Sequence, residues 1–266
     1  MDREHIEKLA ENPNFIPGIY NYCDRWCERC SFTARCMSFA LAEEQFGDSQ
    51  ACDINHEAFW ARLSEVFQLT LDMLKETAEA KGIALDSLDL QAVLDDRKAA
   101  EHITRNHECC RTAKAYSEMI DDWFDSAKGL FEEKADVLNL KARLELPDSN
   151  PQGEASDLED ALDIIRWYQH QIYIKLARAI RPTLEETSYS SDEIPTDSDG
   201  SAKVALIAID RSIAAWGQMY KHFPDRKDDI LHVLVHLDRL RRKTETTFPD
   251  ARKFVRPGFD YTAQRV

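Results

Sequence analysis

Four of the seven cysteines in this chain lie close together near its start. Cys23, Cys27, Cys30 and Cys36 form the pattern C-x3-C-x2-C-x5-C. On a helix or a tight turn the first three fall on one face, and a short bend brings the fourth to them. Thiolates select zinc, copper(I) or iron-sulfur units over hard cations. We therefore predict a metal centre that is held by these four sulfur atoms.

The spacing of these cysteines bears on which metal they hold. Structural zinc commonly uses two pairs of cysteines separated by a loop of a dozen or more residues, and no such gap occurs here. A cubane accepts ligands that are crowded along one short segment, as in the compact ferredoxin motif, although there the fourth cysteine serves another cluster. We expect a 4Fe-4S cluster on Cys23, Cys27, Cys30 and Cys36, with structural zinc on the same residues as the alternative.

Aromatic and basic residues accompany the cysteines along the sequence. Aromatic rings can shield a cluster from water, and arginines can offset the negative charge of thiolates; both effects tune a redox potential. These neighbours favour electron transfer or redox-linked chemistry, with a redox protein or a small molecule as partner, although the rings can also serve only to pack the segment. The residues concerned are Tyr20, Tyr22, Trp26, Phe32, Arg25, Arg29 and Arg35.

Known catalytic signatures do not settle the reaction. The first three cysteines share the C-x3-C-x2-C spacing of radical-SAM enzymes, but those enzymes carry it after a barrel strand, and neither strands nor a glycine-rich cofactor motif are predicted here. We therefore do not assign that family. The chain also lacks a P-loop, a G-x-S-x-G elbow and an H-E-x-x-H motif, which disfavours nucleotide-driven and serine-hydrolase chemistry. Whether the protein is an enzyme stays open.

A second candidate site consists of polar residues within apolar patterns. Asp210 and Arg211 interrupt an apolar stretch that predicts a helix surrounded by protein, where a charge must be paired. Asp163 and His170 lie on one side of the preceding predicted helix. If that side faces the apolar helix, the four residues form a polar pocket suited to acid-base catalysis of a small substrate. The alternative is a structural ion pair with a neighbouring helix.

Composition narrows the class of protein. The 266 residues carry a formal net charge of −15, which disfavours binding to the phosphate backbone of nucleic acids. No apolar run is long enough to span a membrane, and no secretory segment opens the chain, so we expect a cytoplasmic protein without membrane contact. A reducing compartment keeps cysteines as thiols. The sequence leaves the oligomeric state open.

The positions of apolar residues predict helices and no strand. Gly82 is placed to end one helix, and Ser156 with Glu159 forms a capping box that opens another. Cys110 lies on the apolar stripe of a long helix and is expected in the core, whereas Cys52 and Cys109 have no partner pattern. The expected helices cover residues 38–45, 55–80, 86–102, 110–131 with a continuation to 144, 156–180, 201–223 and 225–246.

We thus predict an all-α protein, a multi-helix bundle of about seven helices with an N-terminal cysteine-rich metal-binding segment. Residues 1–50 form that segment and pack on the bundle, residues 51–247 form the bundle, and residues 248–266 form a C-terminal tail. Long sequential helices with short connections favour antiparallel neighbours. Two stretches, 147–153 and 187–201, are expected as loops because of their composition.

Overall fold

The structure is a computed structural model that describes residues 3–85, 89–145, 149–184 and 194–260. These residues form ten α-helices and no strand, which confirms the all-α prediction, although the helices outnumber the seven expected. Short 3-10 turns, labelled η, connect several of them. The helices are α1 (Arg3–Ala10), α2 (Met37–Phe46), α3 (Ser49–Cys52), α4 (Glu57–Ala80), α5 (Leu90–Asn106), α6 (Glu108–Ser126), α7 (Leu130–Leu144), α8 (Pro151–Leu184), α9 (Ile194–His222) and α10 (Lys227–Thr247).

The chain divides into two compact units. Unit 1 comprises residues 1–97 together with 255–266, and unit 2 comprises residues 98–254. The division falls within α5 and does not coincide with the expected boundaries at residues 50 and 247. Residues 51–97 and the end of the chain therefore group with the cysteine-rich segment. That the cysteine-rich segment packs on the bundle stays a prediction.

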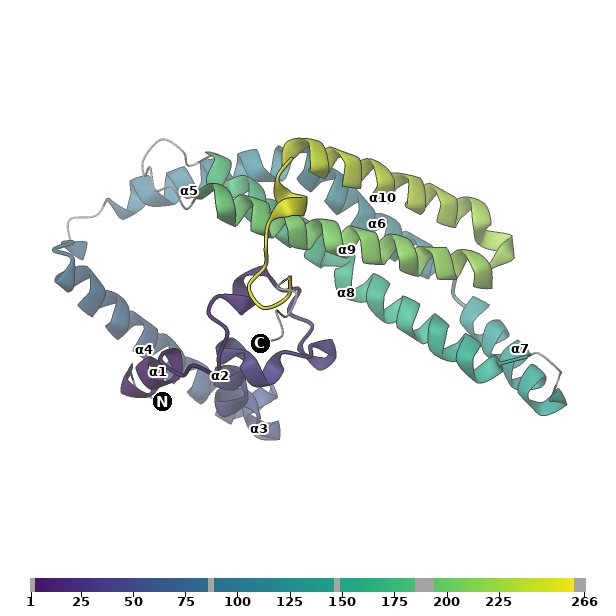
Figure 1. Ribbon diagram of the computed structural model, residues 1–266, viewed down its shortest axis with the longest axis horizontal. Helices are drawn as coiled ribbons and strands as arrows, with labels where there is room; N and C mark the ends of the chain where they lie inside the picture. The colour runs from purple at the N-terminus through teal and green to yellow at the C-terminus, as the bar shows by residue number, and fades with distance from the viewer. Residues whose placement is uncertain (1–2, 86–88, 146–148, 185–193, 261–266) are drawn as a thin grey trace, which may run out of the picture. The chain divides into compact units, whose positions relative to one another are not determined.

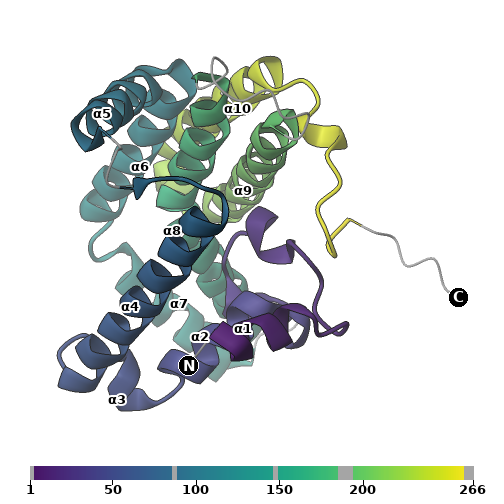
Figure 2. The ribbon, with the colours of Figure 1, turned by 90° about the vertical axis from the view of Figure 1, so that its left-hand side faces the viewer.

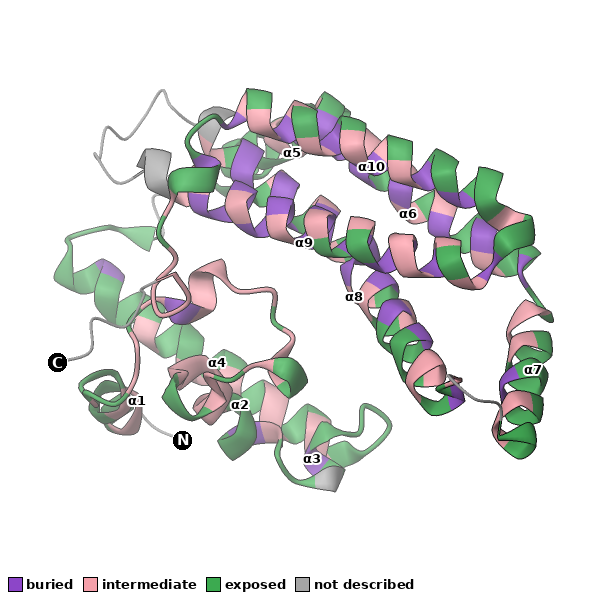
Figure 3. Ribbon diagram, turned by 45° about the vertical axis from the view of Figure 1, so that its right-hand side comes forward, coloured by how far each residue is buried: buried purple, intermediate pink, exposed green. Residues whose placement is uncertain are grey.

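Unit 2 is a helical bundle. Helix α8 packs along α9, α9 contacts α10, α10 contacts α6, and α6 returns to α8, so four helices lie side by side (Figures 1 and 2). Their inner faces carry the buried residues (Figure 3). The largest fully buried side chains of this unit include Trp216, Tyr116 and Tyr168. Burial of these apolar side chains stabilises the bundle.

Two cysteines belong to this core. Cys109 and Cys110, at the start of α6, are fully buried and unpaired, which confirms the expectation that Cys110 packs in the core. Burial raises the pKa of the Cys110 thiol to about 12, and neighbouring Cys109 adds to the rise. Such a thiol stays protonated at neutral pH and behaves as a small apolar side chain.

Two glycines with positive φ bear on the predicted helix limits, one as expected and one not. Helix α4 ends at Ala80, and Gly82 follows with a positive φ of 67°, as the sequence indicates. The prediction of one continuous helix through residues 110–131 and on to 144 is wrong, because Gly129 takes a φ of 92° and separates α6 from α7. Phe124 and Phe131 stack across this break with ring centroids 6.0 Å apart. The apolar stripe therefore continues through a turn.

Two other helices begin earlier than predicted. Helix α8 starts at Pro151 instead of Ser156, because the side chain of Asn150 accepts a hydrogen bond from the Gly153 N–H at 3.0 Å and proline is favoured in a first turn. Helix α9 starts at Ile194, inside the stretch expected as a loop. Asp197 in its first turn pairs with Arg178 at 2.7 Å. Within the two expected loops, residues 147–148 and 187–193 lie outside the described residues.

Unit 1 is built differently. Helices α2, α3 and α4 contact one another, and the 3-10 turn η3 (Thr33–Arg35) contacts α2. Among its described residues, the buried apolar side chains are only Ile19, Ala51 and Ala78. A core of this size contributes little free energy of folding. No described helix in either unit is both long and apolar enough to traverse a lipid bilayer.

Candidate metal centre

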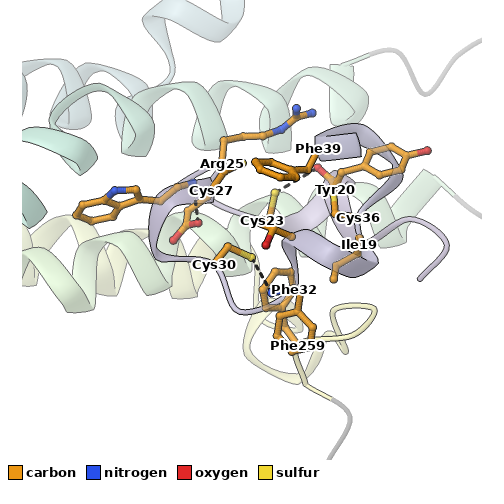
Figure 4. A pocket seen from close by; sticks show the side chains of 13 residues that line it. Ile19, Tyr20, Cys23, Arg25, Cys27, Cys30, Phe32, Cys36, Phe39 and Phe259 are labelled. Carbon is orange, nitrogen blue, oxygen red and sulfur yellow. Dashed lines mark hydrogen bonds between the residues drawn. The ribbon is translucent and has the colours of Figure 1, made fainter. Parts of the chain in front are cut away.

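The four clustered cysteines line one small cavity of unit 1, about 30 Å³ in volume (Figure 4). Cys23 follows the 3-10 turn η1 (Ile19–Tyr22), Cys27 and Cys30 lie at the two ends of the 3-10 turn η2 (Cys27–Arg29), and Cys36 directly precedes α2. All four are half-buried, and none of them forms a disulfide. Consecutive tight turns, instead of a single helix, thus bring the sulfur-bearing residues to one place.

The turn between the first two cysteines is fixed by backbone conformation. The side chain of Asp24 accepts a hydrogen bond from the Trp26 N–H at 3.3 Å, and the Cys27 N–H donates to the Arg25 carbonyl at 3.0 Å. Arg25 takes a φ of 61°, a left-handed conformation that costs a non-glycine residue roughly 1–2 kcal/mol. Strain of this kind persists only where the surrounding structure imposes it, and it concentrates at binding sites.

The third cysteine accepts a hydrogen bond at its sulfur. The Phe32 N–H donates to Cys30 Sγ at 3.4 Å, and Figure 4 draws this bond beside the cavity. The Cys30 N–H donates to the Cys27 carbonyl at 3.1 Å, which closes the turn. Backbone N–H bonds to sulfur are among the contacts by which proteins adjust iron-sulfur potentials. The turn therefore positions a donor that a ligand sulfur can use.

The fourth cysteine lies at the beginning of a helix. The Cys36 carbonyl accepts hydrogen bonds from the first turn of α2, at 3.1 Å from Phe39 N and 3.0 Å from Ala40 N. Cys36 thus lies at the amino end of α2, where the helix dipole carries partial positive charge. The neighbouring Arg35 carbonyl accepts a bond from the Ile16 N–H at 3.0 Å. This bond connects the start of the cysteine-rich stretch to its end.

Aromatic side chains enclose much of the remaining cavity. Tyr20, Trp26 and Phe32 line it, as the sequence indicates, whereas Arg25 is the one lining arginine among the described residues. Arg29 instead lies over the Trp26 ring at 4.2 Å, and Arg35 Nε donates to the Asn14 carbonyl at 3.3 Å. Three of the four aromatic rings that accompany the cysteines in the sequence therefore border the cavity, and Tyr22 does not line it.

The C-terminal strap, residues 255–260, completes the wall. Phe259 lines the cavity and meets Phe32 edge-to-face with centroids 5.1 Å apart (Figure 4). Gly258 has a φ of 78°, and a Cβ there would approach Ile19 Cδ1 to 2.9 Å. Arg256 Nη2 pairs with Asp260 at 2.9 Å across the strap's own turn. Sequence reasoning missed Phe259, because nothing along the chain indicates that a residue so far from the cysteines contacts them.

The thiols of the cavity influence one another. Burial raises the pKa of the Cys27 thiol, and the charges of Cys23, Cys36 and Cys30 raise it further. The Cys23 thiol donates a hydrogen bond to the Tyr20 carbonyl at 3.5 Å. Binding of a metal cation would replace the thiol protons, which would be released to solvent, and would leave thiolate ligands. The cavity is therefore suited to a positively charged centre that takes sulfur ligands.

The four cysteines suit a metal that prefers sulfur ligands, although the described side chains are not arranged around the position of a metal ion. Within the described residues, no group of three or more His, Cys, Asp or Glu side chains is arranged to hold one. Four thiols on one cavity nonetheless match the soft ligands that zinc and iron-sulfur units require. Cys52, the remaining cysteine of unit 1, is exposed and does not line the cavity.

The second candidate site differs from its expectation. Arg211 is exposed and Asp210 is half-buried, so the prediction that protein surrounds both charges is wrong. Asp210 pairs with Arg252 at 2.6 Å and lies 3.8 Å from Arg241 of α10. Asp210 thus forms ion pairs with residues outside α9, which is the arrangement that the structural alternative expects. The Arg211 guanidinium donates to the Tyr168 hydroxyl.

The other two residues of that site, Asp163 and His170, belong to α8. Asp163 and His170 are both exposed on α8. The His170 Nδ1 atom lies 3.1 Å from the Ser117 hydroxyl of α6, away from the partners of Asp210. These contacts give no support to one shared pocket, and a catalytic role for Asp163, His170, Asp210 and Arg211 stays a prediction. Because apolar residues flank positions 210 and 211 along the sequence, the pattern did not reveal that one face of α9 is exposed. Ala214 is also exposed.

No protein-family model matches the chain, and comparison with curated proteins and with solved structures also returned no match. The function is therefore argued from the geometry of the cysteine cavity.

Proposed function

We propose that the protein binds a 4Fe-4S cluster through Cys23, Cys27, Cys30 and Cys36 and uses it for electron transfer or redox-linked chemistry. The observation that carries the proposal is that four cysteines, none of them in a disulfide, line one cavity with aromatic walls. In such a centre each thiolate bonds a different iron, so a cluster requires less convergence of the sulfurs than a single ion does. When bound, the cluster would supply one-electron transfer.

The surrounding residues contribute to that role in separate ways. Phe32 and Phe259 line the cavity with apolar rings, the Phe32 N–H donates to the Cys30 sulfur, and Arg25 places a positive charge on the lining beside the carboxylate of Asp24. Each of these contacts adjusts a redox potential. A redox protein or a redox-active small molecule would be the partner, and we propose neither nucleic acid nor membrane as a target.

The small core of unit 1 gives a second reason to propose a metal. Few of its described side chains are buried, and small modules with little core commonly obtain folding energy from a bound metal. This reason applies equally to the alternative, a structural zinc on the same four cysteines in a helical interaction protein without catalytic activity. The two proposals differ in whether the bound metal is redox-active.

A matched pair of variants tests the proposal. In protein purified without oxygen, we expect C27S to lose the brown chromophore and most of the iron, because one ligand is removed. C52S should retain both, since Cys52 is exposed and lies outside the cavity. Visible absorption and metal analysis provide the readouts.

The same measurement distinguishes the alternative. A colourless wild-type protein with one zinc per chain, together with loss of zinc and thermal stability in C27S, would support structural zinc. A wild-type protein without either metal, or equal loss of iron in C52S and C27S, would contradict binding at these four cysteines.

A further inference from the structure

A second cavity lies in unit 2, on the side where α5, α6 and α8 approach one another. It has a volume of about 450 Å³ and is lined by Arg105 of α5, Lys114 and Ser117 of α6, and His170, Tyr173 and Ile174 of α8. None of these residues takes part in the cysteine cavity. The size is that of a small-molecule site.

The polar groups of this cavity have unused hydrogen-bonding capacity. Within the described part of the chain, neither the Arg105 guanidinium nor the Tyr173 hydroxyl has a hydrogen-bond or ion-pair partner. His170 contacts Ser117 through Nδ1 at 3.1 Å, which leaves Nε2 to face a ligand. Three residues from two helices thus present groups that can donate to one bound molecule.

The charge of the lining contrasts with the charge of the protein. The chain carries a net charge of −15, yet the described residues that line this cavity include arginine, lysine and histidine and no acidic residue. Lys114 pairs with Glu118 at 3.4 Å, but both side chains are more than 60% exposed, and such a pair contributes little. A local excess of positive charge in an acidic protein indicates an anionic ligand.

The lining also specifies the kind of anion. Guanidinium groups bind phosphate through paired N–H donors, and an ammonium supplies a compact positive charge beside them. Ile174 and the Tyr173 ring offer apolar surface in the same cavity. A phosphate ester with an apolar organic part would use both the basic and the apolar groups of this lining.

We propose that this cavity binds a phosphorylated small molecule, with its phosphate on Arg105, Lys114 and His170 and its apolar portion on Ile174 and Tyr173. The proposal is independent of the cysteine cavity, since the two cavities lie in different units and share no residue.

Phenyl phosphate is a suitable probe, because it combines a phosphate monoester with an aromatic ring. We expect saturable binding to the full chain by isothermal titration calorimetry, and weaker binding of inorganic phosphate. R105Q should weaken binding of phenyl phosphate by about tenfold or more, the usual effect of losing a charged hydrogen bond. K128Q is the control, because Lys128 is 79% exposed in unit 2 and does not line the cavity.

Far-UV circular dichroism and the thermal midpoint of each variant establish that it folds like the wild type. Absence of saturable binding, or equal affinities of R105Q and the wild type, would overturn the proposal. Equal weakening by K128Q would show that only overall charge matters and would also overturn it. Co-sedimentation with phosphatidic acid vesicles without binding of phenyl phosphate would replace the small molecule by a lipid headgroup.

Discussion

A buried phenol couples the stability of unit 2 to pH. Tyr116 of α6 is fully buried and accepts a hydrogen bond from Trp216 Nε1 at 3.1 Å. Burial raises the pKa of Tyr116 from 10.0 to about 12. Between these values the unfolded chain releases a proton that the folded chain retains. The stability that this difference supplies is complete below pH 10 and is lost as pH rises towards 12.

Replacing this phenol should reduce the alkaline loss of stability. A pKa difference of this size corresponds to roughly 3 kcal/mol of the free energy of unfolding. Y116F lacks the ionisable group, so its free energy of unfolding should fall less than that of the wild type between pH 9 and 12. At neutral pH it should be lower by about 1–3 kcal/mol, because Trp216 loses its acceptor.

Denaturant unfolding followed by circular dichroism measures both effects of the tyrosine variant. Comparison of the two proteins at each pH cancels the contributions of lysines and other tyrosines. An equally steep decline in wild type and Y116F would contradict the assignment of the alkaline loss to Tyr116.

Individual residues differ in how far the sequence predicts their surroundings. The meeting of the four cysteines could be anticipated because tight turns connect neighbours within one short segment. The exposure of Arg211 could not, because apolar residues flank it along the chain and only packing decides which face of α9 is covered. Phe259 was missed for a related reason, since its contact with Phe32 depends on the path of the strap.

At the level of elements, the C-terminal strap depends on a glycine. Gly258 combines a positive φ of 78° with close approach to Ile19 and Ile16, whereas Gly82, after α4 in the same unit, has a φ of 67° and open space around its Cα. The backbone penalty of an alanine would be similar at both positions, because the left-handed conformation is disfavoured for alanine. Only at Gly258 does the added methyl group also displace neighbouring side chains.

We therefore expect G258A to loosen the strap more than G82A does. G258A should lower the thermal midpoint further and should accelerate the reaction of the metal-free cysteines with a thiol reagent, because Phe259 no longer covers the cavity. Rates for G82A should stay close to those of the wild type. Equal reaction rates in G258A and the wild type would show that the strap does not shield the cysteines.

The sequence predicted helix type better than helix limits. Gly82 ended α4 as expected because it takes the left-handed backbone conformation that stops a helix, although Ile83 and Leu85 follow it. Gly129 was overlooked because Phe124 and Phe131 keep helical spacing on either side of it. The early start of α8 follows from Asn150 and Pro151, a cap and first-turn pair that outweighed the capping box at Ser156.

At the scale of the whole molecule, the two units rely on different sources of stability. Unit 2 has a continuous aromatic and aliphatic core. Unit 1 has few buried side chains of its own and four thiols around one cavity. The division within α5 was not predicted, because the helical spacing of apolar residues continues across the boundary and carries no sign of which unit covers them. This division assigns the proposed metal chemistry to unit 1.

Inorganic sulfide distinguishes a cluster from any single ion, so its determination tests the central proposal most directly. For the full chain purified without oxygen, we predict about four iron atoms and about four acid-labile sulfides per chain, the composition of one cubane. Iron or zinc without labile sulfide, or a chain free of both metals, would contradict a 4Fe-4S cluster on Cys23, Cys27, Cys30 and Cys36.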